Sequence, residues 1–557
     1  MIGMGSRLAN NLWQVSCMPA WYQFRRAVVN LEQVQRRILR NYLIANQNTD
    51  YGRRFDFASI TSVESFQENV PITTYEDYLE LIDAIGKGQP NVLTAEPVTM
   101  FEVTSGSTSA SKLIPYTQSL RSEFQRAIAA WIVNLFRHNP DLKKGPAYWS
   151  ITPLIEGRKT TPGGIPIGFE EDSAYFGLWG KRLVDAALAV PNDVKNCQDV
   201  ETFRYVTLLF LLRQPTLQLI SIWNPTFLSL LLAPLSKWWR ALIGDIANGT
   251  LSPPGFLDTD LRQTLLEQLS PDPRRTSVLA SIQPDDCQAI WPHLSLISCW
   301  MDGSAASYAE ALQTLFPNVF FQGKGLIATE AFVSFPMIGI IGSVLAATSH
   351  FFEFLPVDSQ TLSPSLMQPQ LAHQLEKGQT YSVVVTTGGG LYRYHLHDMV
   401  KVVGHLHQAP CLRFMGKGNK VSDWFGEKLY EQFVANVLED LFCEHGVSPI
   451  FAMLAPDNSQ QNFHYTLYLE LAPNQRSRDG LADLAHDLDQ KLCQNFHYGY
   501  CRKLGQLAEP EIFWIDQGAK EAYLYACQAK GQRLGDIKPS PLQKTTGWGN
   551  YFGTSGK

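Results

Sequence analysis

Paired cysteine motifs are missing from this sequence. Its nine cysteines are scattered, none belongs to a CxxC pair, and their number is odd. A disulfide framework or a structural zinc site is therefore not expected, and a reducing compartment fits best. The first residues also lack the continuous apolar core of a signal peptide. From these two absences we predict a cytoplasmic location.

Excess positive charge and long apolar runs are missing too. The 46 Lys and Arg residues face 52 Asp and Glu residues, so no basic face able to neutralise a nucleic-acid backbone is expected. A membrane-spanning helix needs roughly 20 mostly apolar residues. The two charge-poor runs, 214–236 and 331–352, are interrupted by residues such as Pro225 and Pro336. We therefore expect buried strands and helices there, no nucleic-acid or membrane partner, and a small-molecule substrate.

The length and apolar pattern indicate more than one domain. The chain has 557 residues, 45% of them hydrophobic, which is too long for one ordinary domain. Short apolar runs such as 381–387 alternate with helical patterns, and this favours an α/β architecture with buried strands. Residues 21–46 are predicted to form one amphipathic helix. A second, α+β pattern follows the polar, glycine-containing stretch 416–420. We predict domains at 1–415 and 416–557, with a hinge near 416–420.

A hydroxyl-rich stretch, 104–112 (TSGSTSASK), follows a predicted strand at 99–104. Small residues let backbone N–H groups approach an anion, hydroxyls add donors and a lysine adds charge. We expect the stretch to lead into a helix at 118–136, whose N-terminus would also favour phosphate. The spacing is not that of a Walker A loop, which excludes a P-loop NTPase. From the residues alone, a phosphate site and a solvated Ser/Thr loop remain alternatives.

Two further blocks carry acidic residues in unusual settings. Glu330 lies among apolar residues, where an unpaired carboxylate is costly, so it needs a cation or an arginine partner. Asp398 ends the block YRYHLHD. His395 and His397 in the same block raise the alternative of a zinc site, which we disfavour because zinc needs three or four convergent ligands.

Nine blocks, in the same order along most of the chain, resemble a known family. TSGSTSASKLIPYT is similar to the phosphate loop of adenylate-forming enzymes, which include acyl-CoA synthetases, nonribosomal-peptide adenylation domains and firefly luciferase. More closely, the chain resembles the plant auxin-responsive Gretchen Hagen amido synthetases, as a member of the bacterial type. The other eight blocks are NTDYGRRFDF, VPITTYEDY, GQPNVLTAEPV, GLIATEAFVSFP, SHFFEFLPVD, GLYRYHLHDMVKVVG, LRFMGKGNKVSDWFGEKLYE and FHYGYCRKLGQL.

The resemblance implies a fold and a reaction. The fold would be a large N-terminal adenylate-forming domain, with mixed β-sheets and flanking helices, and a smaller mobile α+β C-terminal domain. The reaction would use ATP and Mg²⁺ to adenylate a small carboxylic acid, and then transfer the acyl group to an amine such as an amino acid. An acid–CoA ligase and a catalytically silent acyl- or nucleotide-binding homologue remain the alternatives. The oligomeric state is not indicated.

The resemblance also assigns roles to individual residues. Thr329 would lie near the α-phosphate, Glu330 would help to hold Mg²⁺, and Asp398 would bind both ribose hydroxyls. The other nucleotide-binding residues would be Ser105, Gly106, Ser107, Thr108, Tyr392 and Lys417. The catalytic cations would be Lys112, Lys428 and Lys538.

The expected acyl pocket and two departures from the family complete the site. We expect Trp223 and Phe227 to line the pocket beside the helix wall at 127–133, although a core role for Trp223 is the alternative.

Many relatives have glycine at the position of Ser109, and the usual family pattern has glycine at the position of His397. A non-glycine residue resists a positive φ, so both positions raise the question of local backbone geometry.

Overall fold

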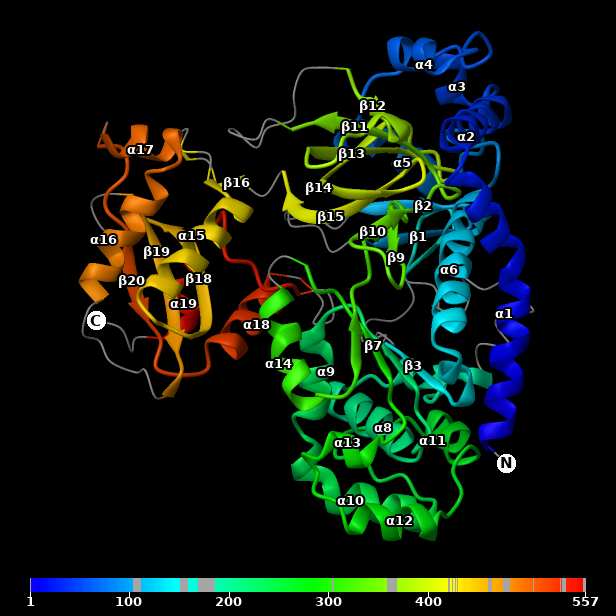
Figure 1. Cartoon of the computed structure of the whole chain (residues 1–557), viewed down its shortest axis with the longest axis vertical. Coiled ribbons are helices and arrows are strands. Elements are labelled where there is room, and N and C mark those ends of the chain that lie inside the picture. The colour runs from blue at the N-terminus through cyan, green and yellow to red at the C-terminus, as the bar shows by residue number, and fades with distance from the viewer. Residues whose placement is uncertain are drawn as a thin grey trace.

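A computed structural model of the chain gives an α/β fold, which confirms the predicted fold class (Figure 1). It describes residues 2–103, 112–150, 159–168, 186–302, 305–357, 368–418, 421–422, 424–425, 427, 429–458, 463–473, 481–503, 505–530, 532 and 537–553.

Two helices, and not one, open the chain. Helix α1 (Ile2–Ala27) ends before Asn30, and helix α2 (Leu31–Asn46) starts after it. The prediction of a single helix over 21–46 was therefore wrong. The break allows Gln35 of α2 to donate to the carbonyl oxygens of Ala347 and His350 and to accept from the Phe352 N–H, all in the core. The short elements that follow are α3 (Asp50–Arg54), α4 (Val63–Asn69), η1 (Tyr75–Tyr78) and α5 (Leu79–Gly86).

The hydroxyl-rich loop joins two strands of a hairpin. Strands β1 (Met100–Val103) and β2 (Leu113–Tyr116) pair antiparallel, with Val103 opposite Leu113. Helix α6 (Gln118–His138) starts only after β2, where the Thr117 side chain accepts from the Leu120 N–H. The expectation that the loop leads directly into this helix was wrong, because the apolar run 113–116 pairs with β1. The sheet is completed by β4 (Lys159–Thr160) and β5 (Pro166–Ile167), in the order β2-β1-β5-β4.

A seven-stranded sheet lies beside this hairpin, in the order β12-β11-β13-β14-β15-β10-β9 (Figure 1). Arg393, just before β14, forms a buried ion pair with Glu353 of β11, at 3.0 Å between Nη2 and Oε1. Arg393 also donates to the carbonyl oxygens of Gln67 and Val70, so it ties the sheet to α4. The strands are β9 (Ser334–Pro336), β10 (Ser343–Leu345), β11 (Phe351–Pro356), β12 (Gln370–Leu371), β13 (Thr380–Thr386), β14 (Tyr394–Leu406) and β15 (Ala409–Lys417).

A parallel four-stranded sheet forms a second core. Its order is β3 (Ala147–Trp149), β6 (Leu219–Ser221), β7 (Leu296–Ser298) and β8 (Phe320–Gln322). In the part of the chain that is described, no helix is both long and apolar enough to cross a membrane. The helices of this region are α8 (Val200–Leu212), α9 (Pro225–Leu232), α10 (Leu235–Asn248), α11 (Thr259–Leu266), α12 (Pro273–Ala280), α13 (Cys287–Ile290) and α14 (Ala306–Leu315).

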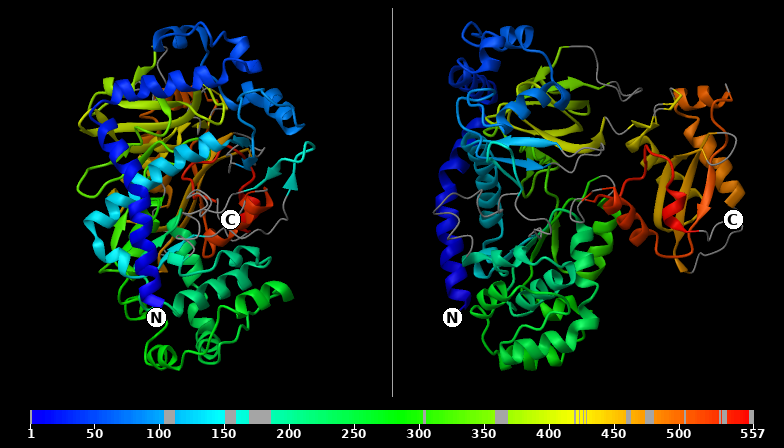
Figure 2. Two further views of the ribbon diagram at one scale, coloured as in Figure 1. Left: turned by 90° about the vertical axis from the view of Figure 1, so that its right-hand side faces the viewer. Right: turned by 180° about the vertical axis from the view of Figure 1, so that it is seen from behind.

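The C-terminal unit stands beside the other sheets and has a core of its own (Figure 2). Its three-stranded sheet has the order β18 (Pro449–Asp457), β19 (His464–Leu471) and β20 (Glu511–Trp514). The predicted α+β pattern is confirmed, whereas the boundary at 416 and the hinge at 416–420 stay predictions. Its other elements are β16 (Val421–Ser422), β17 (Leu429–Tyr430), α15 (Glu431–Glu444), α16 (Leu481–Leu492), α17 (Phe496–Lys503), α18 (Ala519–Ala529) and α19 (Gly549–Phe552).

Candidate active site

Asp398 and Lys417 face each other across the β14–β15 ladder. They are register partners, and 3.6 Å separates Asp398 Oδ1 from Lys417 Nζ. Asp398 is only 2% exposed, whereas 41% of the Lys417 side chain is exposed. The Asp398 carboxylate raises the pKa of Lys417 above its usual value; burial opposes this shift and Glu330 adds to it. The pair therefore places a cation beside a buried carboxylate at the open end of the ladder.

Glu330 lies close to the same pair. It belongs to the segment between β8 and β9 and is half-buried. The Tyr394 hydroxyl donates to Glu330 Oε1 at 3.5 Å. Burial raises the pKa of Tyr394, so its hydroxyl keeps the proton that it donates. Within the described ranges, the polar partner of Glu330 is this hydroxyl and not an arginine, which removes the arginine alternative there.

The β1–β2 hairpin meets this segment through Thr329. The Tyr116 hydroxyl on β2 donates to the Thr329 carbonyl oxygen at 2.7 Å. Just after Glu330, the Phe332 N–H donates to His350 Nε2, and His350 Nδ1 lies 2.7 Å from Glu123 Oε2 on α6. Since Nε2 accepts, Nδ1 carries the hydrogen of this imidazole. Buried contacts therefore hold the segment on both sides of its carboxylate.

Lys112 extends from the end of the hydroxyl-rich loop towards the same region. Its Nζ lies 5.2 Å from the centroid of the Tyr75 ring, and the Tyr75 hydroxyl accepts from the Leu113 N–H at 2.7 Å. The predicted loop residues Ser105, Gly106, Ser107 and Thr108, together with Ser109 and Lys428, lie outside the described residues.

His397 occupies a backbone position that favours glycine. Its φ is 60°, in the left-handed region, and its carbonyl oxygen accepts from the Gly418 N–H at 2.6 Å. Burial, together with the charges of Lys417 and Lys112, lowers the pKa of His397 to about 4. Burial also lowers the pKa of His395 to about 3, and its Nε2 lies 2.7 Å from Ser382 Oγ. Both imidazoles are therefore neutral near pH 7.

A zinc site receives no support from this region. Among the residues that the structure describes, no group of three or more His, Cys, Asp or Glu side chains could hold a metal ion. Glu330 would therefore hold Mg²⁺ only together with oxygens of a bound nucleotide, which is how this ion is usually bound. A half-buried carboxylate near the cation of Lys417 fits that chemistry.

Tyr392 is enclosed in the core, whereas Lys538 lies over an aromatic ring. Tyr392 is 0% exposed, and its ring lies 4.9 Å from that of Tyr51 in a stacked arrangement. Its hydroxyl donates to the Leu93 carbonyl oxygen, so it has no exposed surface with which to contact a nucleotide. Lys538 of the C-terminal unit lies 5.2 Å from the Trp300 ring centroid, just beyond β7.

The expected acyl-pocket residues lie near the carboxyl ends of the parallel sheet. Trp223 follows β6 and is 44% exposed. Phe227 of α9 is half-buried and packs 6.5 Å from the Phe203 ring. Trp131 belongs to the expected helix wall, and Lys324 lies between Trp131 and Trp223, 5.3 Å from each ring centroid. The helix wall at 127–133 and the stretch that contains Trp223 therefore meet at Lys324.

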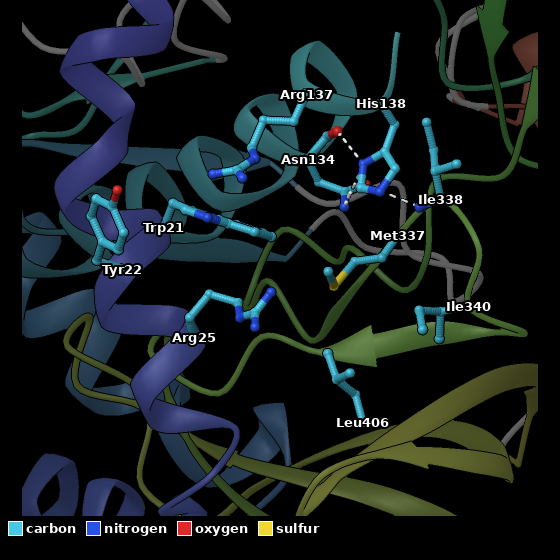
Figure 3. Close-up of a pocket in the computed structure, with 10 residues that line it drawn as sticks. All are labelled: Trp21, Tyr22, Arg25, Asn134, Arg137, His138, Met337, Ile338, Ile340 and Leu406. Atoms are coloured by element: carbon cyan, nitrogen blue, oxygen red, sulfur yellow. Dashed lines mark hydrogen bonds between the residues drawn. The ribbon is translucent and has the colours of Figure 1, made fainter.

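A pocket of about 730 Å³ lies elsewhere, between α1, the end of α6 and residues 337–340 (Figure 3). It contains none of the predicted site residues. Its polar side chains include Arg25, Arg137 and His138, and His138 Nδ1 lies 2.9 Å from the Asn134 carbonyl oxygen. The convergence of carboxylates and cations, and not the volume of this hollow, identifies the candidate active site.

Four residues of the site region were missed by the sequence analysis. Tyr394 and Tyr116 position Glu330 and Thr329, and Tyr75 supports the end of the loop. Their partners are distant in sequence, so no local pattern could reveal them. Lys324 carried a usable signal, because it is the single charged residue between Gln322 and Thr329.

Known proteins share sequence similarity with most of this chain. Models of the GH3 family N-terminal, central and C-terminal domains match residues 20–321, 343–417 and 432–546. The indole-3-acetic acid-amido synthetase GH3.2 of Arabidopsis thaliana is 26% identical over 492 residues, which cover 83% of this chain and 88% of that protein. The indole-3-acetic acid-amido synthetase GH3.17, from the same plant, is 25% identical over 576 residues. These residues cover 93% of this chain and 92% of that protein.

A solved structure extends the similarity to three dimensions. The AtGH3.15 acyl acid amido synthetase in complex with 2,4-DB aligns with a TM-score of 0.81 at 21% identity, covering 96% of this chain and 94% of that one. At that identity, the match shows the fold. Because the three domain models together span most of the sequence, the resemblance to the Gretchen Hagen proteins is confirmed, and the chain belongs to the GH3 family.

Proposed function

We propose that this protein is an ATP-dependent acyl-acid amido synthetase, which adenylates a small carboxylic acid and transfers the acyl group to the amine of an amino acid. One observation carries the proposal: Asp398, Glu330 and Lys417 converge beside the hairpin that carries the hydroxyl-rich loop. Membership of a family with amido synthetases among its relatives supports it. The proposed location is the cytoplasm.

In the first step, a carboxylate oxygen of the acid attacks the α-phosphorus of ATP, and the bond to pyrophosphate breaks. Positioning and charge stabilisation carry such a step. Asp398 binds the ribose hydroxyls, Thr329 lies at the α-phosphate, and residues 105–108 hold the phosphates. Glu330, together with the nucleotide, would hold Mg²⁺, and this ion would supply positive charge to the phosphates. Lys112, Lys417 and Lys428 supply further positive charge.

In the second step, the neutral amine attacks the acyl carbonyl carbon, the bond to AMP breaks, and the amine loses a proton. The C-terminal domain would rotate about the hinge near 416–420 between the two steps, and Lys538 would be one of the cations that it brings. The body of the acid would lie beside Trp223 and Phe227. Tyr392 is not part of this proposal, because it is enclosed in the core.

Acid-dependent exchange of pyrophosphate into ATP tests the first step, and AMP release with an amino acid or with CoA tests the second. We expect exchange with a subset of aromatic, indolic, fatty or jasmonate-like acids, and AMP release that depends on the amino acid. Release with CoA alone would make the protein an acid–CoA ligase. An absence of exchange with every acid of the panel would support the alternative of a catalytically silent acyl- or nucleotide-binding homologue.

A further inference from the structure

The pocket between α1 and the end of α6 combines an apolar floor with two arginines. Its volume of about 730 Å³ lies within the usual range for small-molecule sites, roughly 300–1,000 Å³. Figure 3 shows the buried side chain of Trp21 between the exposed side chains of Arg25 and Arg137. An apolar hollow with a few charged groups is the usual composition of a site for a small ligand with a charged end. The other apolar lining residues are Met337, Ile338, Ile340 and Leu406.

Hydrogen bonds between distant segments hold the walls of this pocket in place. The Ile338 N–H donates to Oδ1 of the buried Asn134 at 2.9 Å, which ties the segment after β9 to α6. On the other side, the Gln408 N–H donates to the Val28 carbonyl oxygen at 2.9 Å, and the Leu31 N–H donates to Gln408 Oε1 at 2.9 Å. These bonds join the turn between β14 and β15 to the break after α1. The pocket is therefore shaped before a ligand binds, which lowers the free-energy cost of binding.

The charge that faces the pocket is positive. Within the described part of the chain, neither Arg25 nor Arg137 has a carboxylate partner, and Arg25 lies 5.7 Å from the centroid of the Trp21 ring. Each arginine belongs to the last turn of a helix, and a helix C-terminus carries about half a negative elementary charge. Two helix ends offset about one of the two arginine charges, so about one unit of positive charge remains. None of the ten described lining residues is acidic.

We propose that this pocket binds a small monocarboxylate with an apolar body, at a place separate from the candidate active site. A guanidinium group donates two parallel N–H groups to a carboxylate, and one carboxylate matches the positive charge that remains. The body of the ligand would lie on Trp21 and Met337. The pocket contains none of the residues assigned to the amido synthetase reaction, so the proposal goes beyond that function and does not depend on it.

A photoreactive acid and its neutral analogue test the proposal: 4-(trifluoromethyldiazirinyl)benzoate and 4-(trifluoromethyldiazirinyl)benzyl alcohol. The two probes share one body and differ in charge. The full chain without ATP is irradiated with increasing concentrations of either probe, and mass spectrometry measures the labelling of residues 21–22 and 337–340. We expect saturable labelling by the benzoate, with half-saturation at a concentration about 10-fold or more below that of the alcohol. Because labelling is read at these residues alone, binding of the acid elsewhere does not disturb the measurement.

Substitution of either arginine should remove this preference in part. Arg25→Met and Arg137→Met should each raise the half-saturating concentration of the benzoate about 5-fold, the upper range for a partly exposed ion pair, and leave that of the alcohol unchanged. Arg25→Lys should retain the preference. Arg26→Met is the matched control, because Arg26 is exposed in the same last turn of α1 but does not line the pocket. All three side chains are exposed, so every variant should keep the melting temperature of the wild type.

Equal half-saturating concentrations for the two probes, labelling without saturation, or unchanged labelling in both methionine variants would overturn the proposal. A loss of the same size in Arg26→Met would overturn it too, because the effect would then belong to the helix end and not to the pocket. An absence of pyrophosphate exchange with every acid would contradict the proposed function and leave this labelling unaffected, so the two failures are distinguishable.

Discussion

The charge of the Asp398 side chain can be removed by a substitution that keeps its shape. Asp398→Asn keeps the shape but removes the charge that lies 3.6 Å from Lys417 and that is proposed to accept the ribose hydroxyls. We expect pyrophosphate exchange to fall about 100-fold or more, the scale of losing one preorganised polar group, with an unchanged melting temperature. The exposed Asp141→Asn is the control. Wild-type exchange rates in Asp398→Asn would remove this residue from the site.

The buried imidazole of His395 makes stability depend on pH. Its folded-state pKa of about 3 lies below the ordinary value of 6.5, so the unfolded chain binds the proton first as the pH falls. Its contribution is complete above about pH 6.5 and is lost towards pH 3, at up to about 1.4 kcal/mol per pH unit. Urea unfolding between pH 4 and 7 should therefore show a shallower pH slope for His395→Gln than for the wild type. His486→Gln, at an exposed histidine, is the control, and equal slopes in all three proteins would contradict the prediction.

At the scale of elements, one ion pair joins β11, β14 and α4. Arg393 and Glu353 are 4% and 1% exposed, so removing only the cation leaves a buried carboxylate without its charge partner. Arg393→Met should lower the free energy of unfolding by about 3–5 kcal/mol, measured by urea denaturation. The double variant Arg393→Met/Glu353→Met should lose less than the single one, because no charge is stranded. A double variant less stable than Arg393→Met would contradict this account.

Local patterns predicted those elements whose causes are local. The segments predicted at 118–136 and 381–387 are α6 and β13, and the motif blocks indicated Asp398 and Glu330. The break between α1 and α2 was missed, since the contacts that it allows join Gln35 to residues more than 300 positions later. Strand β2 was missed because a four-residue apolar run has no period of its own. The tyrosines that position the site were missed for the same reason as the start of α2, because only the fold brings their partners close to them.

At the scale of the whole molecule, two lysines connect the C-terminal unit to the rest of the chain. Lys520 lies 4.8 Å from the Tyr308 ring centroid on α14, and Lys538 lies over Trp300. Such contacts contribute about 0.5–1 kcal/mol each. Lys520→Ala should therefore make hydrogen–deuterium exchange of α14 amides about 2- to 5-fold faster. The exposed Lys503→Ala, in the same unit, should leave these amides unchanged, and equal rates in both variants would contradict a docking role for Lys520.

The pairing of Asp398 with Lys417 has a consequence for the nascent chain. The loop of the β1–β2 hairpin leaves the ribosome roughly three hundred residues before this pair does, since a chain grows from its N-terminus at about 5–20 residues per second. For about 15 to 60 seconds of synthesis at those rates, the polypeptide has one part of the proposed nucleotide site and lacks the other. Under the proposed function, ATP would therefore give no help to the folding of the emerging chain, and its stabilising effect would begin only once β15 has been translated.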